Sequence, residues 1–446
     1  MNSRSNRRRC SELNHQNIYV SLDIGSSTVK VLIGEVSDDQ LHVIGVGQAK
    51  STGIRKGAIV DIDTTVQSIR KAVEQAERMT GLKIEDVVLG VPANQTFLQP
   101  VKGVVAVSSD NREITDEDLD RVTESAQVMS IPPERELVNL IPKQYIVDNL
   151  DEIKDPRGMI GIRLELDATM ITTSKTLLHN VLRCVERAGL NILSIYLQPY
   201  AGGLYALTED EKNQGTAYID LGGGSTTVAV FENGLLTNTA VIPVGGDHIT
   251  KDLSIVLKTP TEQAEKIKRE YGHAYYDDAS SEELFEVPVV GTDTTDQYSQ
   301  RYISEIIGVR LEELFELILD ELARMGVRDL PGGVVLTGGV AQLEGIAQLA
   351  REVLLTRVRI YTPDYIGVRE PAFTTAVGLI KHANEEDEFY GRAASSPTPA
   401  SYAPYPTQQT PPKKQQKVTA VAELEEPKEK VSMMSRAKNI INKFFE

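Results

Sequence analysis

Two patterns of apolar residues alternate along most of the chain. Between Ile18 and about His382, short runs of apolar and β-branched residues alternate with stretches whose apolar residues recur at helical spacing. The first pattern is typical of buried strands, and the second of helices that pack on one face. Their alternation predicts an α/β fold. One helical stretch spans residues 177–185, and there we expect Cys184 to have a packing role.

Two stretches of this region share one plan. Residues 18–36 (IYVSLDIGSSTVKVLIGEV) and 217–234 (AYIDLGGGSTTVAVFENG) each contain an apolar strand, an aspartate, a glycine-rich turn and a second apolar strand. A third glycine turn, in residues 332–346 (GGVVLTGGVAQLEGI), follows a buried strand and precedes a helix. Either hairpin alone is equally well explained as a tight turn. The repeat predicts two related half-domains that present glycine turns to a shared ligand.

The residues of these hairpins are suited to phosphate and magnesium. A carboxylate such as Asp23 at a strand end can orient magnesium-bound water. Gly25 lets the backbone turn so that its neighbouring amides can face phosphate oxygens, and Lys30 can reach the same oxygens. The second hairpin repeats these parts with Asp220, Gly222, Gly223, Gly224, Ser225 and Thr226. The chain has neither a Walker loop nor a dinucleotide GxGxxG motif, so we favour two hairpins that close on one polyphosphate.

In this order, the three turns resemble the phosphate-1, phosphate-2 and adenosine motifs of the superfamily of actin, Hsp70 and sugar-kinase ATPases, over residues 18–382. The resemblance implies an α/β, actin-like two-lobed fold of duplicated ribonuclease-H-like domains, with ATP and Mg²⁺ as cofactors. It implies that Asp23 and Asp220 hold magnesium through water. The residues implied to contact the nucleotide are Gly25, Ser26, Ser27, Lys30, Gly222, Gly223, Gly224, Ser225, Thr226, Gly338 and Gly339.

Three further positions gain a role from the same resemblance. Gln198 matches the glutamine that places the attacking water in actin, although Gln198-Pro199 is also a helix start. Glu265 and Lys268 match the helix that holds adenine and ribose, although their spacing alone favours a solvated ion pair. Val228 stands where some filament-forming relatives carry glutamate. We therefore expect ATP binding, with hydrolysis weak or regulatory.

A further unit, residues 84–163, has its own strands and a helix that starts at Thr115-Asp116-Glu117. Its LIPKQYIVDN and GMIGIRLE segments, together with PVGGDHITKDL (243–253) and LQPYAGG, resemble the FtsA family of bacterial cell-division proteins. The resemblance implies that the chain tethers the polymer of tubulin-like FtsZ to the membrane and recruits later division proteins. It also implies FtsZ-tail docking around 252–305 and self-assembly through the lobes and the inserted unit. Within that range we interpret the acidic segment 277–286 as a solvated loop.

The C-terminal region changes composition. Residues 385–431 are rich in proline and polar residues and are typical of a disordered tether. In 432–446, apolar and basic residues separate on two sides of a helical pattern, as in helices that lie in a membrane interface. The residues expected to meet anionic lipids are Met433, Met434, Arg436, Lys438, Ile440, Ile441, Lys443, Phe444 and Phe445. A partner-protein groove is the competing interpretation, and docking on the core is disfavoured by the long tether.

Composition and charge limit the alternatives. The chain has 446 residues, 41% of them hydrophobic, and a net charge of −17, which argues against broad nucleic-acid binding. Two cysteines are too few for a disulfide framework, and no signal peptide or run of about 20 apolar residues is present. Both ends are basic, so the acidic body carries the negative charge and would be held away from an anionic membrane. The resemblance to the FtsA family implies a location at the cytoplasmic face of the membrane at the septum.

A small-molecule kinase and a chaperone-like ATPase are the rival functions. The sequence shows neither the extra acid/base pair that a kinase would need nor the C-terminal substrate domain of a chaperone.

The expected organisation divides the chain into seven parts. The expected parts are a basic leader (1–16), lobe 1 (17–83, 164–200 and about 366–384), the inserted unit (84–163), lobe 2 (201–251 and 306–365), a smaller subdomain of lobe 2 (252–305), the tether (385–431) and the amphipathic helix (432–446).

Overall fold

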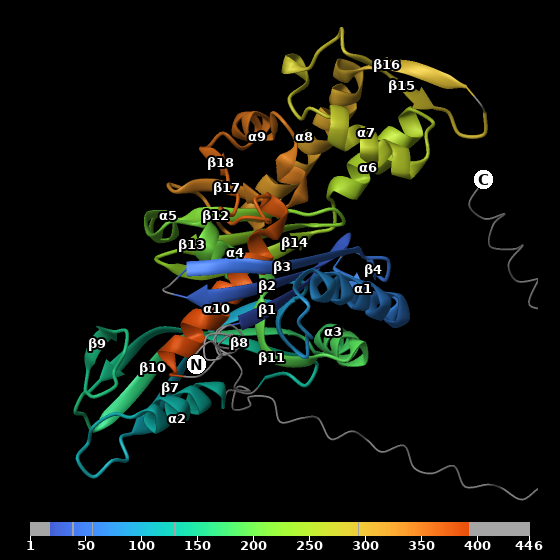
Figure 1. Cartoon of the computed structure of the whole chain (residues 1–446). Helices are drawn as coiled ribbons and strands as arrows, with labels where there is room; N and C mark the ends of the chain where they lie inside the picture. The colour runs from blue at the N-terminus through green and yellow to red at the C-terminus, as the bar shows by residue number, and fades with distance from the viewer. Residues whose placement is uncertain (1–17, 38–39, 56, 129–130, 293, 392–446) are drawn as a thin grey trace, which may run out of the picture. The chain divides into compact units, whose positions relative to one another are not determined.

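The structure, a computed structural model, describes residues 18–37, 40–55, 57–128, 131–292 and 294–391 (Figure 1). The chain divides into two compact units, Met1–Thr398 and Pro399–Glu446, and the described residues all belong to the first. The expectations for the basic leader, for most of the tether and for the amphipathic helix lie outside the described residues. Among those that are described, no helix is long and apolar enough to cross a membrane.

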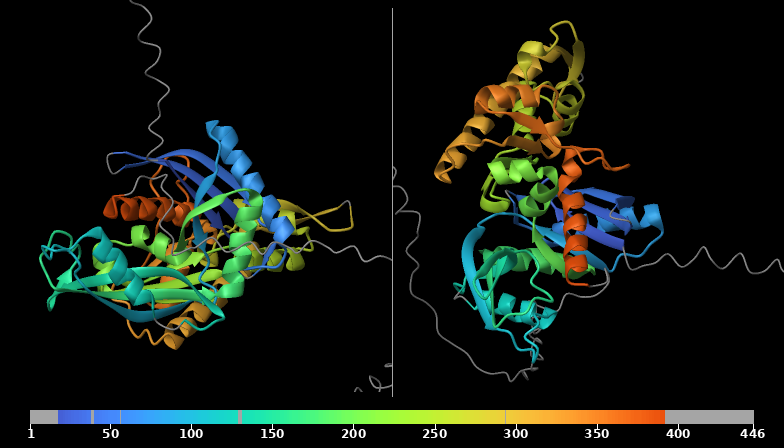
Figure 2. Two further views of the ribbon diagram at one scale, coloured as in Figure 1. Left: turned by 90° about the horizontal axis from the view of Figure 1, so that it is seen from below. Right: turned by 90° about the vertical axis from the view of Figure 1, so that its left-hand side faces the viewer.

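Lobe 1 is built on a five-stranded sheet in the order β3-β2-β1-β6-β11. The first three strands are antiparallel neighbours, and β6 and β11 continue the sheet in parallel with β1. Helices α1 and α3 lie together on one side of this sheet, and α4 and α10 lie on the other (Figures 1 and 2). The elements are β1 (Ile18–Ile24), β2 (Thr28–Ser37), β3 (Gln40–Lys50), β4 (Ile54–Arg55), β5 (Ala58–Ile59), α1 (Ile62–Thr80), β6 (Asp86–Val91), α3 (Lys175–Ala188), β11 (Asn191–Leu197), α4 (Gln198–Ala206) and α10 (Thr374–Phe389).

Lobe 2 repeats the sheet of lobe 1. Its strands run β14-β13-β12-β17-β18, again with an antiparallel meander followed by two parallel strands. The predicted duplication is therefore confirmed. The elements are α5 (Glu209–Gln214), β12 (Thr216–Leu221), β13 (Thr226–Glu232), β14 (Leu235–Ile242), α6 (Gly246–Val256), α7 (Thr261–Tyr271), η2 (Tyr276–Asp278), β15 (Leu284–Pro288), β16 (Thr295–Ser299), α8 (Gln300–Arg324), β17 (Gly333–Thr337), η3 (Gly339–Gln342), α9 (Ile346–Leu354), β18 (Val358–Ile360) and η4 (Pro371–Phe373).

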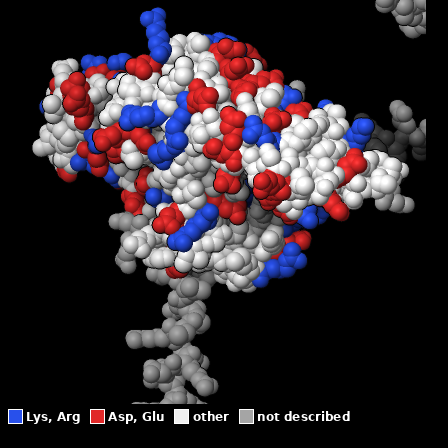
Figure 3. Space-filling model, turned by 90° about the horizontal axis from the view of Figure 1, so that it is seen from above, with Lys and Arg blue, Asp and Glu red and all other residues white. Residues whose placement is uncertain are grey.

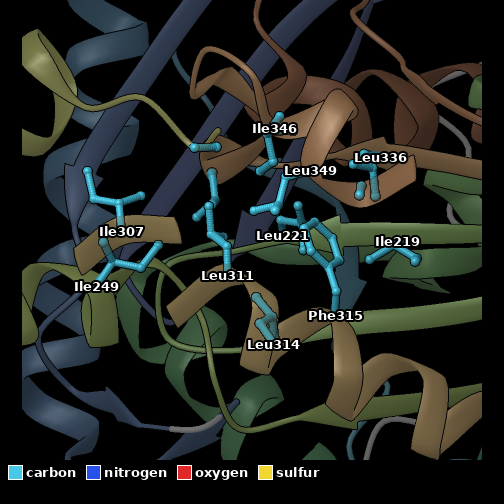
Figure 4. Close-up of a cluster of buried hydrophobic side chains, with 14 of the residues drawn as sticks. Ile219, Leu221, Ile249, Ile307, Leu311, Leu314, Phe315, Leu336, Ile346 and Leu349 are labelled. Atoms are coloured by element: carbon cyan, nitrogen blue, oxygen red, sulfur yellow. The ribbon is translucent and has the colours of Figure 1, made fainter. Parts of the chain in front are cut away.

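Helix α8 organises the core of lobe 2. Its residues Leu311, Leu314 and Phe315 are fully or almost fully buried and belong to one apolar cluster with strand residues such as Ile219, Leu221 and Leu336 (Figure 4). Burial of a side chain of this size contributes about 1.5–3 kcal/mol. This packing fixes the strand ends from which the glycine turns of lobe 2 emerge.

The inserted domain has its own four-stranded sheet, in the order β7-β10-β8-β9, and helix α2 covers β7 and β10. Helix α2 begins after Thr115 with three acidic residues in its first turn, as predicted, because acidic side chains stabilise helix N-termini. A methyl group at Gly103 would overlap the backbone of α2, so glycine allows the close packing. The elements are β7 (Phe97–Ala106), α2 (Asp116–Gln127), β8 (Arg135–Val147), β9 (Leu150–Ile153) and β10 (Arg163–Ser174).

The structure corrects three expected boundaries. Strand β6 pairs with β1 and so belongs to lobe 1, whereas all of β10 belongs to the inserted sheet, so the expected limits of 84 and 163 were both too early. Helix α10 continues to Phe389, so the tether does not begin at 385. The acidic segment 277–286 is only partly a loop, because η2 covers its start and β15 begins at Leu284. Cys184 is buried in α3, as predicted.

His382 on α10 gives the body a pH-dependent element. Its ring makes edge contacts with Tyr196 and Tyr200, at centroid distances of 4.5 and 5.2 Å. Burial lowers the pKa of His382 to about 4, below the ordinary value of 6.5.

We therefore expect the wild type to lose about 2 kcal/mol of unfolding free energy between pH 7 and pH 5 through this residue, because the unfolded chain takes up the proton first. The variant His382→Phe keeps an aromatic ring but has no group to protonate, so it lacks this pH-dependent loss of unfolding free energy. Denaturant unfolding at both pH values measures the difference. Equal pH dependence in the two proteins would contradict the assignment.

Candidate functional site

The two hairpins, β1–β2 and β12–β13, have the same turn geometry. Across the β1–β2 pair, Asp23 lies opposite Lys30, and across the β12–β13 pair, Asp220 lies opposite Thr227. A Cβ atom at Gly25 would lie 2.7 Å from the carbonyl oxygen three residues on, and one at Gly222 meets the equivalent oxygen at 2.7 Å. Both turns therefore need glycine. They differ in that only the first hairpin places a lysine across from its aspartate.

Four polar side chains converge at the ends of these strands. Lys30 Nζ lies 3.3 Å from Asp23 Oδ2, and the amide of Gln198, the first residue of α4, donates to Asp23 Oδ1 at 2.8 Å. Burial raises the pKa of Asp220 to about 6, while Lys30 opposes this and Asp23 adds to it. Asp23, Asp220 and Lys30 thus interact across the boundary between the lobes.

This donor set fits magnesium. Mg²⁺ prefers hard oxygen ligands and is held in proteins by one or two carboxylates, with water and phosphate completing its shell. Asp23 and Asp220 supply two such carboxylates, and the elevated pKa of Asp220 marks a buried negative charge with too little compensation. The described residues hold no cluster of three or more His, Cys, Asp or Glu that would bind a metal by itself.

The glycine turns of the two lobes face each other. A methyl group at Gly223 would overlap the Ser27 hydroxyl, and one at Gly224 would lie 2.7 Å from Ser26 Cβ. Ser26 Oγ accepts from the Gly57 amide at 3.1 Å. The structure therefore brings together the residues that the sequence predicts to grip one polyphosphate from two sides.

Asp247 is a site residue that the sequence interpretation missed. It lies in the first turn of α6, where its carboxylate accepts from Ser27 Oγ at 2.8 Å and its amide donates to the Gly223 carbonyl at 2.8 Å. The PVGGDHITKDL segment contains this residue, but its sequence gives no sign that it reaches the other lobe. Asp247 links the two hairpins directly.

Thr226 and Val228 do not face the phosphate turns. Thr226 is fully buried, and its hydroxyl donates to the Val244 carbonyl at 2.9 Å, so it fixes the start of α6. The expectation that Thr226 grips phosphate is therefore wrong for its side chain. Val228 lies in the core of lobe 2.

Lys268 lies inside the protein and joins α7 to α6. Its ammonium group donates to Glu265 Oε2 at 2.6 Å, to Thr250 Oγ1 at 2.8 Å and to the Gly246 carbonyl at 3.1 Å. Because Lys268 is buried, the alternative of a solvated surface pair does not hold for it. Lys268 and Glu265 therefore support the start of α6, which lies next to the second hairpin.

Gly338 and Gly339 follow β17 and provide a matched pair for a test. Gly338 has a φ of 88°, and a methyl group there would overlap Asp220 Oδ1, whereas nothing lies within 4 Å of the corresponding position at Gly339. We expect Gly338→Ala to lower the unfolding free energy by about 1–3 kcal/mol and to weaken nucleotide binding. Gly339→Ala is the control for stability and should leave the unfolding free energy unchanged. Denaturant unfolding measures both variants and ATP titration measures Gly338→Ala, and equal losses of unfolding free energy in the two variants would contradict this placement of Gly338.

Comparison with known proteins places the chain in a family. Residues 217–378 match the family model described as cell division protein FtsA, and residues 93–172 match the SHS2 domain inserted in FtsA. The cell division protein FtsA of Bacillus subtilis is 54% identical over 380 residues, covering 85% of this chain and 86% of the relative. The chain belongs to the FtsA family. The FtsA of Enterococcus hirae, 42% identical over 373 residues, covers 84% of each chain.

Solved structures support the same fold. The chain is similar to the PilM–PilN type IV pilus biogenesis complex, with a TM-score of 0.56 and 18% identity over 82% of this chain and 98% of that one. MreB5 of Spiroplasma citri bound to ADP has a TM-score of 0.51 and 14% identity over 83% and 97%. This member of the FtsA family is an actin-like cell-division protein, as the three glycine turns and the FtsA-like segments of the chain together predict. The family favours division over the kinase and chaperone alternatives.

Proposed function

We propose that this FtsA family member tethers FtsZ polymers to the cytoplasmic membrane at the septum and binds Mg²⁺-ATP between its lobes. The observation that best supports the tethering of FtsZ is an exposed apolar groove between α6 and α8. Membership of the family supplies the division context. The nucleotide, the groove and the C-terminal segment are three separable parts of the proposal.

The paired hairpins would bind the nucleotide phosphates. Asp23 and Asp220 would hold a magnesium ion that neutralises phosphate charge, while Lys30 and the amides of Ser26 and Ser27 bind phosphate oxygens. Two solved MreB5 structures of Spiroplasma citri, bound to ADP and to AMPPNP, share the fold, and we extend nucleotide binding to this chain. Gly338 and Gly339 would pass beside the adenosine.

Hydrolysis would be weak or regulatory. The amide nitrogen of Gln198 already donates to Asp23, which leaves its carbonyl oxygen to position a water molecule. Val228 is buried in the lobe 2 core and provides no carboxylate. Gln198 is therefore the proposed water-positioning residue, and the hairpins serve mainly to bind ATP.

The groove that we assign to the FtsZ tail has a volume of about 430 Å³. Ile255 on α6 and Val309 on α8 are each 63% exposed, although soluble proteins usually keep such side chains apart on their surface. Arg310 joins the two walls by donating to Asp252 Oδ2 at 2.6 Å. On the face shown in Figure 3, acidic and basic side chains are interspersed with uncharged areas. A tail segment with apolar anchors fits this groove, which extends the expected docking region beyond 305.

We expect Val309→Glu to weaken binding of an FtsZ C-terminal peptide by about 30-fold, because a charged side chain replaces a central apolar contact. Val60→Glu is the matched control, since Val60 in lobe 1 is 60% exposed but lies outside the groove. Titration of labelled peptide onto the full chain measures both. Unchanged affinity in Val309→Glu, or an equal loss in Val60→Glu, would contradict the assignment.

The remaining partners follow the family resemblance. Residues 432–446 would bind anionic lipids and hold the body at the cytoplasmic face of the membrane. Self-assembly through the lobes and the inserted domain, and binding of later division proteins, complete the proposal. Each copy in an assembly would add one membrane contact, so weak single contacts become strong together.

A further inference from the structure

The last turn of α10 lacks the charge that normally stabilises a helix end. The segment ends in Glu385, Glu386, Asp387 and Glu388, and no basic residue lies in the last turn. Helix C-termini carry a partial negative charge that favours cations and disfavours carboxylates. Taken alone, this end of α10 should therefore unwind easily.

Two tyrosines of lobe 1 hold part of this acidic end. Tyr19 donates to Asp387 at 3.2 Å, and Tyr196 donates to Glu386. These bonds neutralise no charge, and they reach only side chains. The carbonyl groups that end the helix need a donor from elsewhere.

Arg157 of the inserted domain supplies both the donor and the positive charge. Its Nη1 donates to the Phe389 carbonyl at 2.6 Å, and its guanidinium lies 4.6 Å from the centre of the Phe389 ring. The two residues are 232 positions apart. A guanidinium that caps a carbonyl and stacks on the adjacent ring makes a charge-assisted bond and a cation–π contact together.

The inserted domain holds Arg157 in place for this contact. Asp155 accepts from Arg157 Nε at 2.9 Å and from Nη2 at 2.7 Å, and Asp116, at the start of α2, lies 3.3 Å from Nη1. The backbone turns at Gly158, which has a φ of 77°. The Arg157 guanidinium group, a fork of N–H donors, is therefore positioned by contacts within its own domain.

We propose that Arg157 is a positioning residue that caps α10 from the inserted domain and couples that domain to the point where the chain leaves the body. The domain is otherwise attached near its connections to lobe 1, where Asn139 donates to the Ile195 carbonyl at 3.0 Å and accepts from the Leu197 amide at 3.2 Å. A movement of the inserted domain that withdraws Arg157 would free the last turn of α10. This coupling does not depend on what the C-terminal segment binds.

Amide hydrogen exchange on the full chain tests the proposal. In Arg157→Gln we expect exchange of the amides of Tyr390 and Gly391, which bond to Glu386 and Glu388, to rise about tenfold or more. Arg157→Lys keeps the charge but loses the guanidinium group and its stacking on Phe389. In this variant the exchange of the same amides should rise less. Arg163→Gln is the control, because Arg163 lies in the same domain and pairs with Glu165 at 3.1 Å.

Coupling also has a reciprocal readout. Replacing Phe389 with alanine should speed exchange in residues 154–160, because the fork then loses its stacking partner. A change within twofold at Tyr390 and Gly391 in Arg157→Gln would overturn the proposal. An equal rise in amide exchange across the whole body would also overturn it, because that would show a loss of global stability and not the loss of a local contact at the end of α10.

Discussion

Replacing Lys30 with methionine should weaken Mg²⁺-ATP binding by about 100-fold. Lys30 Nζ lies 3.3 Å from Asp23 and also moderates the pKa of Asp220, so it is the cation that both carboxylates share. A hydrogen bond to a charged group contributes about 1.5–3 kcal/mol, and two uncompensated negative charges would then repel the incoming phosphates. Methionine keeps most of the side-chain volume. Calorimetric titration of Mg²⁺-ATP measures the effect.

Two further variants separate binding from stability. Lys71→Met removes a lysine from the exposed face of α1 and should bind ATP normally. Asp23→Asn combined with Lys30→Met removes both partners of the pair, so it should recover stability without recovering affinity. Wild-type affinity in Lys30→Met would contradict the phosphate site. Recovered affinity in the double variant would show that Lys30 only supports the fold.

The duplicated core could be predicted because its signals are local. An aspartate, a glycine turn and a returning apolar strand define each hairpin within about 20 residues, and the two copies predict the same sheet order. The limits of the inserted domain could not be predicted in this way. Residues 86–91 are an apolar strand in either domain, and only the pairing of β6 with β1 places them in lobe 1.

What could not be predicted at the site has the same cause. Spacing alone places Glu265 and Lys268 on one helical face and leaves a solvated pair open, because the burial of Lys268 depends on α6, which packs against α7. Thr226 follows the glycine turn as a polar residue, yet its hydroxyl donates to the Val244 carbonyl. Asp247 and Arg157 act on elements far away in the chain. Such contacts are set by tertiary packing, which no short sequence window contains.

Removal of residues 432–446 should abolish binding to vesicles that contain anionic lipid. The segment separates apolar residues, among them Ile441 and Phe444, from Lys438 and Lys443 in a helical pattern. A helix this short is marginal in water, whereas the interface buries its apolar side and attracts its basic side. The acidic body, which carries the net negative charge of the chain, is repelled by the same lipids.

Point variants distinguish apolar burial from charge. Ile441→Asp and Asn439→Asp each lower the net charge by one, but only the first disrupts the apolar side. We expect about 100-fold weaker vesicle binding in Ile441→Asp, from lost burial and a charged group in the interface, and a loss of less than tenfold in Asn439→Asp. Co-sedimentation with vesicles of mixed neutral and anionic lipid measures both. Equal losses in the two variants would mean that charge alone drives binding. Unchanged binding after deletion of 432–446 would mean that the segment serves a protein partner, and the membrane contact would then lie elsewhere in the chain.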